Sequence, residues 1–412
     1  MTDGGQPGGP ASTSMVSVDE HLADVAATVR PLAPIELALA EAEGCALASD
    51  VTARYPLPSF DNSAMDGYAV RAADITDVPA CLPVTGEVAA GDTGAYGVAP
   101  GQAIRIMTGA QLPAGADTVV PVEWTDGGTT KVLIRQPAEP GNAIRRSGDD
   151  ARAGDVLLTA GTLLGPPQIG LAAAAGLAAV LVRPRPRAVI ISTGNELAEP
   201  GAPLVPGKIW ESNSFMLAAA ARQAGCLAYR VASVPDDPHA LLETIEDQFL
   251  RADLLITSGG VSMGGENDVV KDVLQRLGTV TFRKVAMQPG MPQGFGVIGP
   301  DETPIFTLPG NPVSAYVSFQ VFVRAALDAL LRTRDLALPV TRAVLSGPLR
   351  APAGRRAFLR GVLNRSEGTV EPLTGQGSHQ LATLGRANSL IVVPEWIVAM
   401  KEGDEAEVMI LP

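Results

Sequence analysis

Three stretches decide the fold of the central part of this chain: AVIISTGNEL (residues 188–197), LLITSGGVSMG (254–264) and IFTLPGNPVS (305–314). Each begins with apolar, strand-forming residues and ends in glycine and polar residues. Helical patterns lie between and after them, and such alternation is typical of parallel strands joined by helices. The sequence therefore predicts an α/β domain, a parallel sheet covered by helices, over about residues 187–334. Its strands are expected at 188–192, 254–257 and 305–308, and its helices at 214–223, 238–251, 269–277 and 313–331.

Short β-rich runs separated by turn signals occupy the regions on both sides of this domain. Residues 51–154 contain such runs at 103–107, 118–122 and 131–136, and predict a small all-β domain. The segment from residue 335 to the end predicts a second one, with strands at 341–345, 357–363, 390–393 and 405–410. Residues 15–52 are expected to be helical, first from Val18 and again over 35–42. The opening 14 residues have no signal-peptide pattern and are expected to form a disordered tail.

Composition and charge narrow the possible functions. A chain of 412 residues, 46% hydrophobic and 18% charged, is expected to form several folded domains. Its net charge of −13 argues against nucleic acid as a partner. Its longest apolar run, 169–182, is too short for membrane insertion. Three scattered cysteines and three scattered histidines argue against disulfides and zinc, so we expect a cytoplasmic protein.

Loops rich in glycine and polar residues follow the three predicted strands. In parallel sheets ligands bind beyond the carboxyl ends of the strands, where glycine allows close approach to a phosphate. One such loop alone would be explained by turn formation, but three at one sheet edge favour an anion site. The loops are TGNEL (193–197), SGGVSMG (258–264) and PGNPVS (309–314).

Acidic residues cluster around the same loops. Carboxylates beside a phosphate site are what Mg²⁺ requires. Asp237 precedes Pro238 and is explained as a helix N-cap, so Asp236 is the better functional candidate. Asp268 is equally explained as a favourable charge near a helix start, so both metal binding and a structural role remain open. In the first β region, Asp66-Gly67 alone predicts no more than a turn.

Eight motifs nevertheless occur in the order found in one enzyme family. They are FDNSAMDGYAV (60–70), IRIMTGA (104–110), IRRSGDD (144–150), STGNEL (192–197), DDPHAL (236–241), SGGVSMG (258–264), LPGNPVSA (308–315) and QGSH (376–379). With them the chain resembles the molybdopterin molybdenumtransferases, the family of MoeA and the E domain of gephyrin. The resemblance covers nearly the whole chain.

This resemblance implies an elongated homodimer whose subunits each have four domains. The expected parts are a parallel α/β domain similar to MogA (15–33 and 185–335), a linking mixed domain (34–52 and 155–184), an inserted small β domain (53–154) and a C-terminal β-barrel-like domain (336–412). The implied substrates are adenylylated molybdopterin and molybdate, with Mg²⁺ as cofactor. Molybdenum is inserted at the dithiolene and AMP is released. The molybdopterin adenylyltransferase is a further possible partner.

The resemblance also assigns roles to individual residues, in a site where the inserted domain of one subunit faces the α/β and C-terminal domains of the other. Catalytic positions are Asp66, Thr108, Asp150, Glu196, Asp236 and Asp268, of which the last three are the implied metal ligands. Implied substrate-binding positions are Ser258, Gly259, Gly260, Ser262, Lys284, Gln288, Pro309, Gly310, Asn311, Pro312, Ser314, Arg360 and Ser378.

Two departures from the family pattern concern this site. Residues 288–292 are QPGMP where the family often has KPGKP, so Gln288 and Met291 replace two cations. Glutamine still donates a hydrogen bond but supplies no charge. One additional residue precedes Asp268, which leaves Glu266 as an alternative metal ligand.

Two other functions compete with the transferase. A gephyrin-like dimeric scaffold would bind a partner peptide and would have lost catalysis, and the changes at Gln288 and Met291 fit such drift. The second is an adenylyltransferase that uses only the α/β domain. That function does not explain why the two β domains retain Asp66, Thr108, Arg360 and Ser378 at the matching positions of the family motifs.

Overall fold

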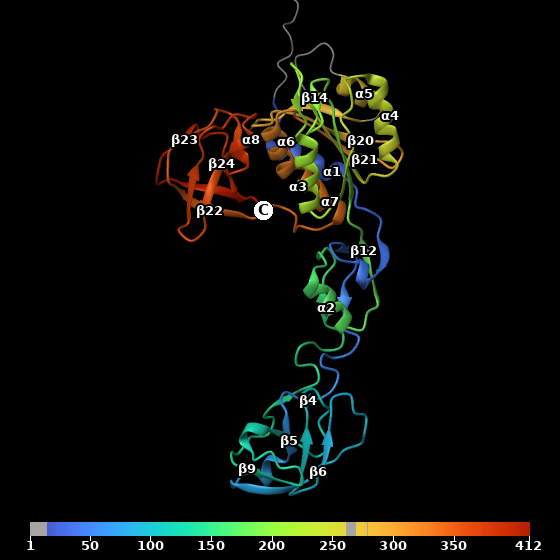
Figure 1. Cartoon of the computed structure of the whole chain (residues 1–412), viewed down its shortest axis with the longest axis vertical. Coiled ribbons are helices and arrows are strands. Elements are labelled where there is room, and N and C mark those ends of the chain that lie inside the picture. The colour runs from blue at the N-terminus through green and yellow to red at the C-terminus, as the bar shows by residue number, and fades with distance from the viewer. Residues whose placement is uncertain (1–14, 261–268, 278) are drawn as a thin grey trace, which may run out of the picture.

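The structure is a computed structural model that describes residues 15–260, 269–277 and 279–412. The predicted tail and the site positions Ser262, Glu266 and Asp268 lie outside these residues. The described chain is elongated: the α/β domain and the C-terminal β domain lie at one end, and the inserted β domain lies at the other (Figure 1). The exact domain boundaries given above stay a prediction.

The central sheet has six strands in the order β16-β13-β17-β21-β20-β18. The first four are parallel, as predicted, and the last two, which were not predicted from the sequence, are added antiparallel at one edge. The connections from β18 through β20 to β21 are too short for a crossover helix, which parallel neighbours need. The strands are β13 (Arg187–Ser192), β16 (Leu227–Arg230), β17 (Leu254–Ser258), β18 (Thr281–Lys284), β20 (Pro292–Ile298) and β21 (Thr303–Leu308).

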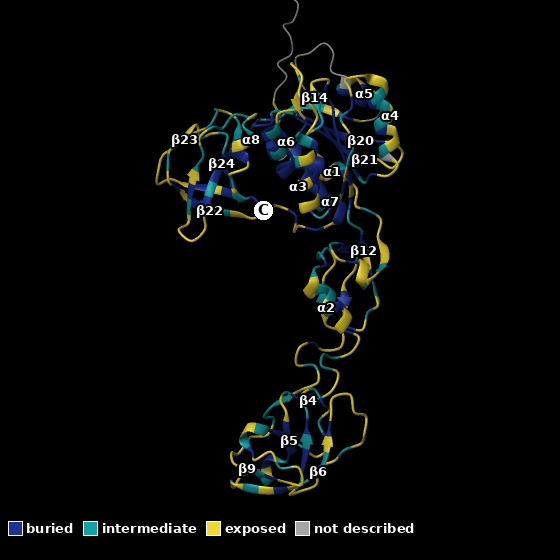
Figure 2. Cartoon of the chain, in the orientation of Figure 1, coloured by how far each residue is buried: buried dark blue, intermediate teal, exposed yellow. Residues whose placement is uncertain are grey.

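Helices cover both faces of this sheet (Figure 2). Alternate residues of β13 show why: Ile190 packs into a core with α1, α3 and α7, while Val189 and Ile191 pack against α4 and α5. Side chains along a strand alternate between faces, so a strand buried on both sides is apolar throughout. The helices are α1 (Val18–Thr28), α3 (Asn213–Gln223), α4 (Pro238–Phe249), α5 (Val269–Leu277), α6 (Pro312–Ser318) and α7 (Arg324–Leu331).

The predicted helix over residues 313–331 contains an irregularity. A π-helical turn at Phe319–Val323 separates α6 from α7. Within the described chain, Pro312–Leu331 is the one helical stretch long and apolar enough to span a membrane. However, 72% of its apolar window is buried inside the fold, as in a core helix.

In the linking region one prediction was wrong. Residues 35–42, expected to be helical, form strand β1 (Ile35–Ala38) and a short 3-10 turn (Leu39–Glu41). Strand β1 pairs antiparallel with β12 (Ala179–Arg183), some 140 residues later, which outweighs the local helical propensity. The rest of this region consists of β2 (Ala46–Leu47), β3 (Val51–Thr52), β11 (Val156–Leu158) and helix α2 (Pro166–Ala174).

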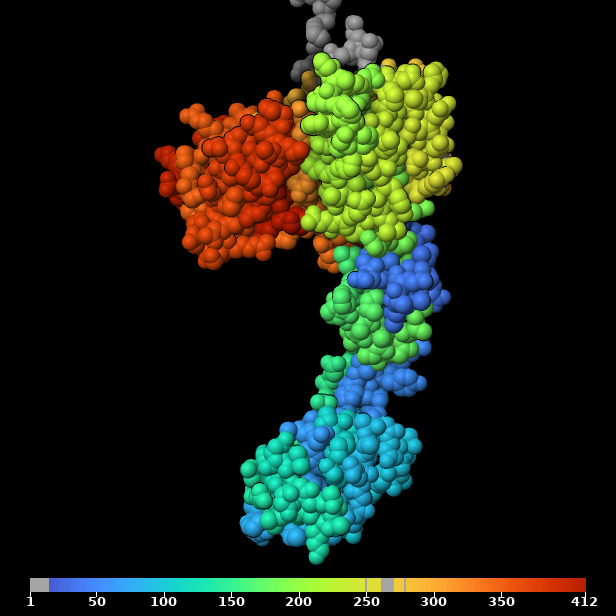
Figure 3. Space-filling view, in the orientation of Figure 1, coloured from blue at the N-terminus to red at the C-terminus, as the bar shows by residue number. Residues whose placement is uncertain are grey.

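The inserted domain is built on a five-stranded sheet in the order β8-β5-β7-β6-β9. In the space-filling view it is joined to the rest of the molecule only through the linking region (Figure 3). Its sheet strands are β5 (Gly67–Val70), β6 (Ala80–Val88), β7 (Ala103–Ile106), β8 (Thr118–Pro121) and β9 (Lys131–Ile134), and β4 (Asn62–Ser63) pairs with β10 (Ile144–Arg145) beside them.

The C-terminal domain is a closed barrel, as predicted. Its sheet runs β24-β25-β22-β28-β26, and β26 pairs again with β24. Strand β19 (Met287–Gln288) of the α/β domain adds to β24 and fixes the barrel against that domain. The barrel strands are β22 (Val340–Leu345), β24 (Arg356–Asn364), β25 (Thr369–Pro372), β26 (Ser389–Val393) and β28 (Glu405–Ile410), accompanied by β23 (Leu349–Arg350), β27 (Ala399–Met400) and α8 (Leu381–Leu384).

Candidate active site

The loops that follow β13, β17 and β21 meet at the carboxyl edge of the sheet, as the sequence predicts. The amide of Thr193 donates to the carbonyl of Ser258 at 3.1 Å, and the amide of Gly259 donates to the carbonyl of Leu308 at 3.2 Å. A Cβ at Gly259, whose φ is +101°, would lie 2.7 Å from the Thr193 carbonyl oxygen. Only glycine fits there, because the position combines a left-handed backbone with a close approach of a neighbouring loop.

Glu196 and Asp236 lie on two neighbouring loops that are held together by backbone and side-chain hydrogen bonds. The amide of Asn195 donates to Asp236 Oδ2 at 3.1 Å, and the amide of Asp236 donates to Asn195 Oδ1 at 3.2 Å. Both acidic residues are exposed. Asp237 instead accepts from the amide of Ala240 at 2.8 Å and caps α4. The assignment of the N-cap to Asp237 is therefore confirmed, and Asp236 is free of that role.

These two carboxylates are oxygen donors of the kind that Mg²⁺ prefers, and their exposure leaves room for the waters it keeps. Over the described ranges no three acidic, histidine or cysteine side chains form a metal-binding group. The predicted third ligand, Asp268, and its alternative Glu266 lie outside those ranges. The described pair Glu196 and Asp236 thus fits part of a Mg²⁺ site, and the full ligand set stays a prediction.

A cavity of about 290 Å³ lies between the α/β domain and the barrel. It brings together four predicted positions: Gln288, Asn311, Ser314 and Ser378. Arg355 is the one charged side chain on its wall, whereas the neighbouring Arg356 forms ion pairs with Asp19 and Glu395. The rest of the lining is Met287, Pro289, Gly290, Met291, Pro292, Gln376 and Gly377. The cavity is therefore polar, with neutral hydrogen-bonding groups and one cation.

Arg360 lies behind this cavity rather than on its wall. Its side chain is fully buried in β24, and one of its terminal nitrogens donates to the carbonyls of Gly375 at 2.6 Å and Gly377 at 3.2 Å. Its other two guanidinium nitrogens have no partner in the described residues. Burial lowers the pKa of this guanidinium. Arg360 thereby holds the segment that leads to Ser378.

The remaining predicted binding positions that the structure describes are not part of the cavity wall. Lys284 ends β18 and is half-buried, while its carbonyl accepts from Val16. Pro309 offers its carbonyl to the Ser258 hydroxyl at 3.5 Å. Pro312 is the first residue of α6. Gly310 lies against the loop after β17, because a Cβ there would lie 3.7 Å from the Cα of Gly259. Gly260 has a left-handed backbone with φ +66°.

In the inserted domain, Asp66 and Thr108 form a pair. Asp66 Oδ1 accepts from both the amide and the hydroxyl of Thr108, at 2.7 and 2.8 Å. These bonds lower the pKa of Asp66, because they stabilise the charged form. The amide of Asp150 donates to the carbonyl of Leu57 at 2.9 Å, in the segment that leads toward the linking region.

The predicted site residues thus form two groups at opposite ends of the chain. Asp66 and Thr108 belong to the inserted domain, and the acidic loops and the cavity belong to the other end (Figure 1). A single copy of the chain does not bring the two groups together.

Three residues with evident roles at the site were missed by sequence reasoning. Glu211 and Asn213 belong to the polar run at the start of α3, whose first residue is Asn213, and this run signals a helix start but not burial or contact with other loops. Arg355 lies in a turn of the barrel, and nothing in its local sequence indicates that it faces the cavity.

Comparison with protein families matches three models in order along the chain. Residues 16–176 match the MoeA N-terminal region (domain I and II), residues 189–329 a probable molybdopterin binding domain, and residues 342–411 the MoeA C-terminal region (domain IV). Molybdopterin molybdenumtransferase 2 of Mycobacterium tuberculosis H37Rv is 48% identical over 404 residues, covering 96% of this chain and 99% of the relative. Molybdopterin molybdenumtransferase 1 of the same strain is 40% identical over 423 residues, with the same coverage of both chains.

Solved structures agree with this result. The molybdopterin biosynthesis moeA protein from Pyrococcus horikoshii OT3 superposes with a TM-score of 0.80 at 28% identity, covering 96% of this chain and all of that one. The expected multidomain fold, an α/β domain with an inserted β domain, a linking domain and a C-terminal barrel, is thereby confirmed. With matches along almost its full length, the chain belongs to the MoeA family of molybdopterin molybdenumtransferases.

Proposed function

We propose that this protein inserts molybdenum from molybdate into adenylylated molybdopterin and releases AMP, with Mg²⁺ as cofactor. The observation that carries the proposal is the convergence of three strand-end loops beside two acidic residues and a polar cavity. The relatives named as molybdopterin molybdenumtransferases support the same reaction and do not favour a scaffold that has lost catalysis.

The loops after β17 and β21 suit the phosphate-bearing part of the substrate. Gly259 and Gly260 have left-handed backbones and place no side chain in the way of a phosphate, which is how glycine-rich loops allow close approach of phosphate oxygens. Glu196 and Asp236 would hold Mg²⁺ beside these phosphates. When bound, that ion neutralises charge on the phosphoanhydride that is cleaved as AMP leaves.

The cavity between the α/β domain and the barrel suits molybdate, a tetrahedral dianion. The hydroxyls of Ser314 and Ser378 and the amides of Gln288 and Asn311 are hydrogen-bond donors on its wall. Arg355 supplies the positive charge that Gln288 and Met291 lack. Asn311 makes no hydrogen bond to cap α6, which leaves its amide available to a ligand.

A complete site requires a second copy of the chain in this proposal. The Asp66 carboxylate is kept ionised and oriented by Thr108, at the far end of the molecule from Glu196 and Asp236. In a homodimer, the inserted domain of one subunit would present Asp66 to the α/β domain and barrel of the other. The adenylylated substrate implies an adenylyltransferase as its source.

The test is AMP release from adenylylated molybdopterin by the purified protein, with and without molybdate and Mg²⁺. We expect release that depends on both and is lost in Asp236→Ala. Asp237→Ala is the matched control, because it removes the neighbouring carboxylate that only caps α4. No release by a folded wild-type dimer would contradict the proposal.

A further inference from the structure

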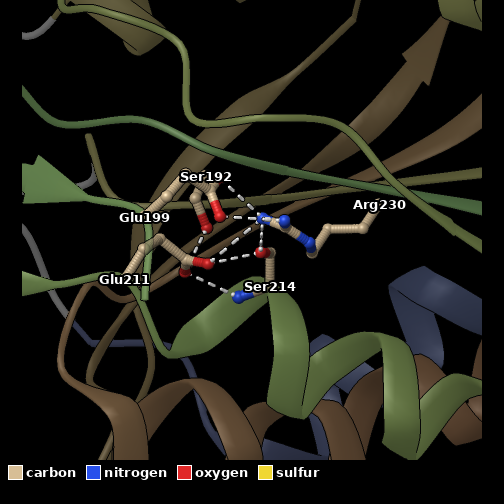
Figure 4. Close-up of polar contacts among 5 residues, drawn as sticks. All are labelled: Ser192, Glu199, Glu211, Ser214 and Arg230. Carbon is tan, nitrogen blue, oxygen red and sulfur yellow. Dashed lines mark hydrogen bonds and ion pairs between the residues drawn. The ribbon is translucent and has the colours of Figure 1, made fainter. Parts of the chain in front are cut away.

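Glu211 is a buried carboxylate that the proposed reaction does not use directly. Its side chain is 1% exposed and lies just before α3. Oε1 accepts from the Ser192 hydroxyl at 2.9 Å and from the Ser214 amide at 2.8 Å, and Oε2 accepts from the Ser214 hydroxyl (Figure 4). A buried charge needs such partners, because desolvation of an unpaired carboxylate is strongly unfavourable.

Arg230 offsets part of the negative charge of this cluster. It lies 3.7 Å from Glu211, forms two hydrogen bonds of 3.0 Å with Glu199, and stacks 3.8 Å above the ring of Phe215. Glu199 and Glu211 therefore share one guanidinium (Figure 4). Since Glu199 lies on the loop after β13 and Arg230 ends β16, the cluster spans the sheet edge.

The cluster closes the base of the loop that carries Glu196. This loop leaves the sheet after Ser192, the last residue of β13, and returns at Glu211. Near its base the short strands β14 (Leu197–Ala198) and β15 (Ile209–Trp210) pair in parallel, and the Glu211 amide donates to the Ala198 carbonyl at 2.8 Å. Glu211 therefore joins the two ends of the loop through its backbone and through its side chain.

Asn213, two residues further on, reaches the other two loops of the site. Its side-chain amide donates to the Ser258 hydroxyl at 2.8 Å and to the Gly310 carbonyl at 2.6 Å. The segment from Glu211 to Ser214 thus contacts the ends of β13, β17 and β21 at once. No other segment that we find in the described chain makes side-chain hydrogen bonds to all three strand ends.

We infer that Glu211 is a positioning residue, which fixes the loop bearing Glu196 against α3 and so sets the geometry of the acidic half of the site. This inference rests on the proposed function for its catalytic consequence. The contacts of Glu211 with Ser192, Ser214 and Arg230, which we call the clamp, do not depend on that function, because they are present in the folded chain.

Two variants remove the clamp in different ways, and a third is a matched control. Glu211→Gln removes the charge, and Ser192→Ala removes only the hydrogen bond to the strand end. Asp253→Asn breaks the ion pair with Arg187 at the opposite end of β13, where Asp253 is 16% exposed and the bonds are 2.8–3.0 Å long. All three weaken polar contacts of the same strand, so a general loss of stability affects them alike.

The first measurement is hydrogen exchange in full-length protein without ligands. We expect exchange in residues 193–198 to be at least about tenfold faster in Glu211→Gln and Ser192→Ala, and unchanged in Asp253→Asn. Unchanged exchange in the first two variants overturns the inference. If Glu211→Gln fails to fold, Ser192→Ala decides the question alone.

The second measurement is AMP release, which distinguishes a positioning role of Glu211 from a general contribution to the stability of the protein. We expect the two clamp variants to lower kcat about tenfold and to raise the Mg²⁺ concentration for half-maximal rate, because Glu196 is displaced. Asp253→Asn should keep both values even where its melting temperature falls. A kcat and Mg²⁺ dependence like wild type in both clamp variants also overturns the inference. Failure of the wild type to release AMP would instead reject the proposed function, and hydrogen exchange would still decide on the clamp.

Discussion

Asp66 of the inserted domain and Asp236 of the α/β domain are both exposed aspartates in loops at the edge of a sheet, but they are held differently. Asp66 is fixed within its own small domain by the amide and hydroxyl of Thr108. Asp236 is fixed by Asn195 from a neighbouring loop, beside Glu196. Each half of the proposed site is therefore ordered locally, whereas a site with both aspartates requires two copies of the chain in the function proposed above.

The largest expected effect comes from removing either aspartate. Asp66→Ala and Asp236→Ala should each lower the rate of AMP release on the order of 1,000-fold, because each removes the carboxylate that one half of the proposed site contributes. Neither should change the melting temperature much, since both side chains are exposed. The measurement is AMP release at saturating substrate together with thermal unfolding.

Mixing Asp66→Ala with Asp236→Ala tests whether the two halves of the site come from different subunits. If the halves come from different subunits, a mixed dimer contains one site with both aspartates and one with neither. Random exchange of subunits makes half of the dimers mixed, so about one quarter of the wild-type activity should return. No recovery after demonstrated subunit exchange would show that each chain builds its own site.

Lowering the pH should destabilise the α/β domain before it destabilises the inserted domain. His21 is 2% exposed, packs edge-on against Phe322 and Phe295, and has no hydrogen-bond partner among the described residues. Burial lowers its pKa from 6.5 to about 4, so the unfolded chain binds a proton that the fold excludes. The stability of the α/β domain should therefore fall by up to about 3 kcal/mol as the pH drops from above 6.5 to 4.

The inserted domain should behave differently in the same titration. It has no histidine, and hydrogen bonds lower the pKa values of Asp61, Asp66 and Asp126 below their ordinary 3.8. Their contribution is present above pH 3.8 and is lost only below it. Hydrogen exchange at pH 7, 5 and 4 should show the α/β domain opening first. His21→Leu should remove the difference, and a difference that persists would exclude His21 as its cause.

A smaller effect is expected at Asp237, next to Asp236. Asp237→Ala removes the N-cap of α4 and should destabilise the α/β domain by about 1 kcal/mol. AMP release should stay close to that of wild type at a temperature where the variant is folded. Loss of activity without loss of stability would show that the two neighbouring aspartates share the catalytic role.

The smallest effect concerns the cavity beside the barrel. Met291→Lys adds a second cation near Arg355 and should lower the molybdate concentration needed for half-maximal rate by no more than about fivefold, because both positions are only half-buried and water and salt still screen their charges. Met291→Gln is the neutral control. An equal gain in both variants would mean that polarity, not charge, limits molybdate binding.

The loop that carries Glu196 was accessible to sequence reasoning because it lies directly after a predicted strand, whereas the strand before Asp236, β16, was not predicted. The same reasoning assigned the N-cap to Asp237, since a carboxylate before proline at a helix start is a local pattern. It did not find Arg355, because the turn that carries it reaches the cavity only after the barrel closes and β19 pairs with β24. The resemblance implies a substrate-binding role for Arg360, but it does not indicate that the folded barrel buries this side chain.

The sequence by itself determined the central strands, their glycine-bearing loops and the two β domains, because these follow from short-range patterns of apolar and turn residues. Tertiary structure alone decided that Ile35–Ala38 is a strand, since pairing with the distant β12 outweighs local propensity. It further decided that β18 and β20 add to the sheet as antiparallel strands beyond β21. It also decided that Glu211 is buried beneath the site and that Asp66 lies at the far end of the chain. Burial and distance are properties of the packed molecule, and no local pattern encodes them.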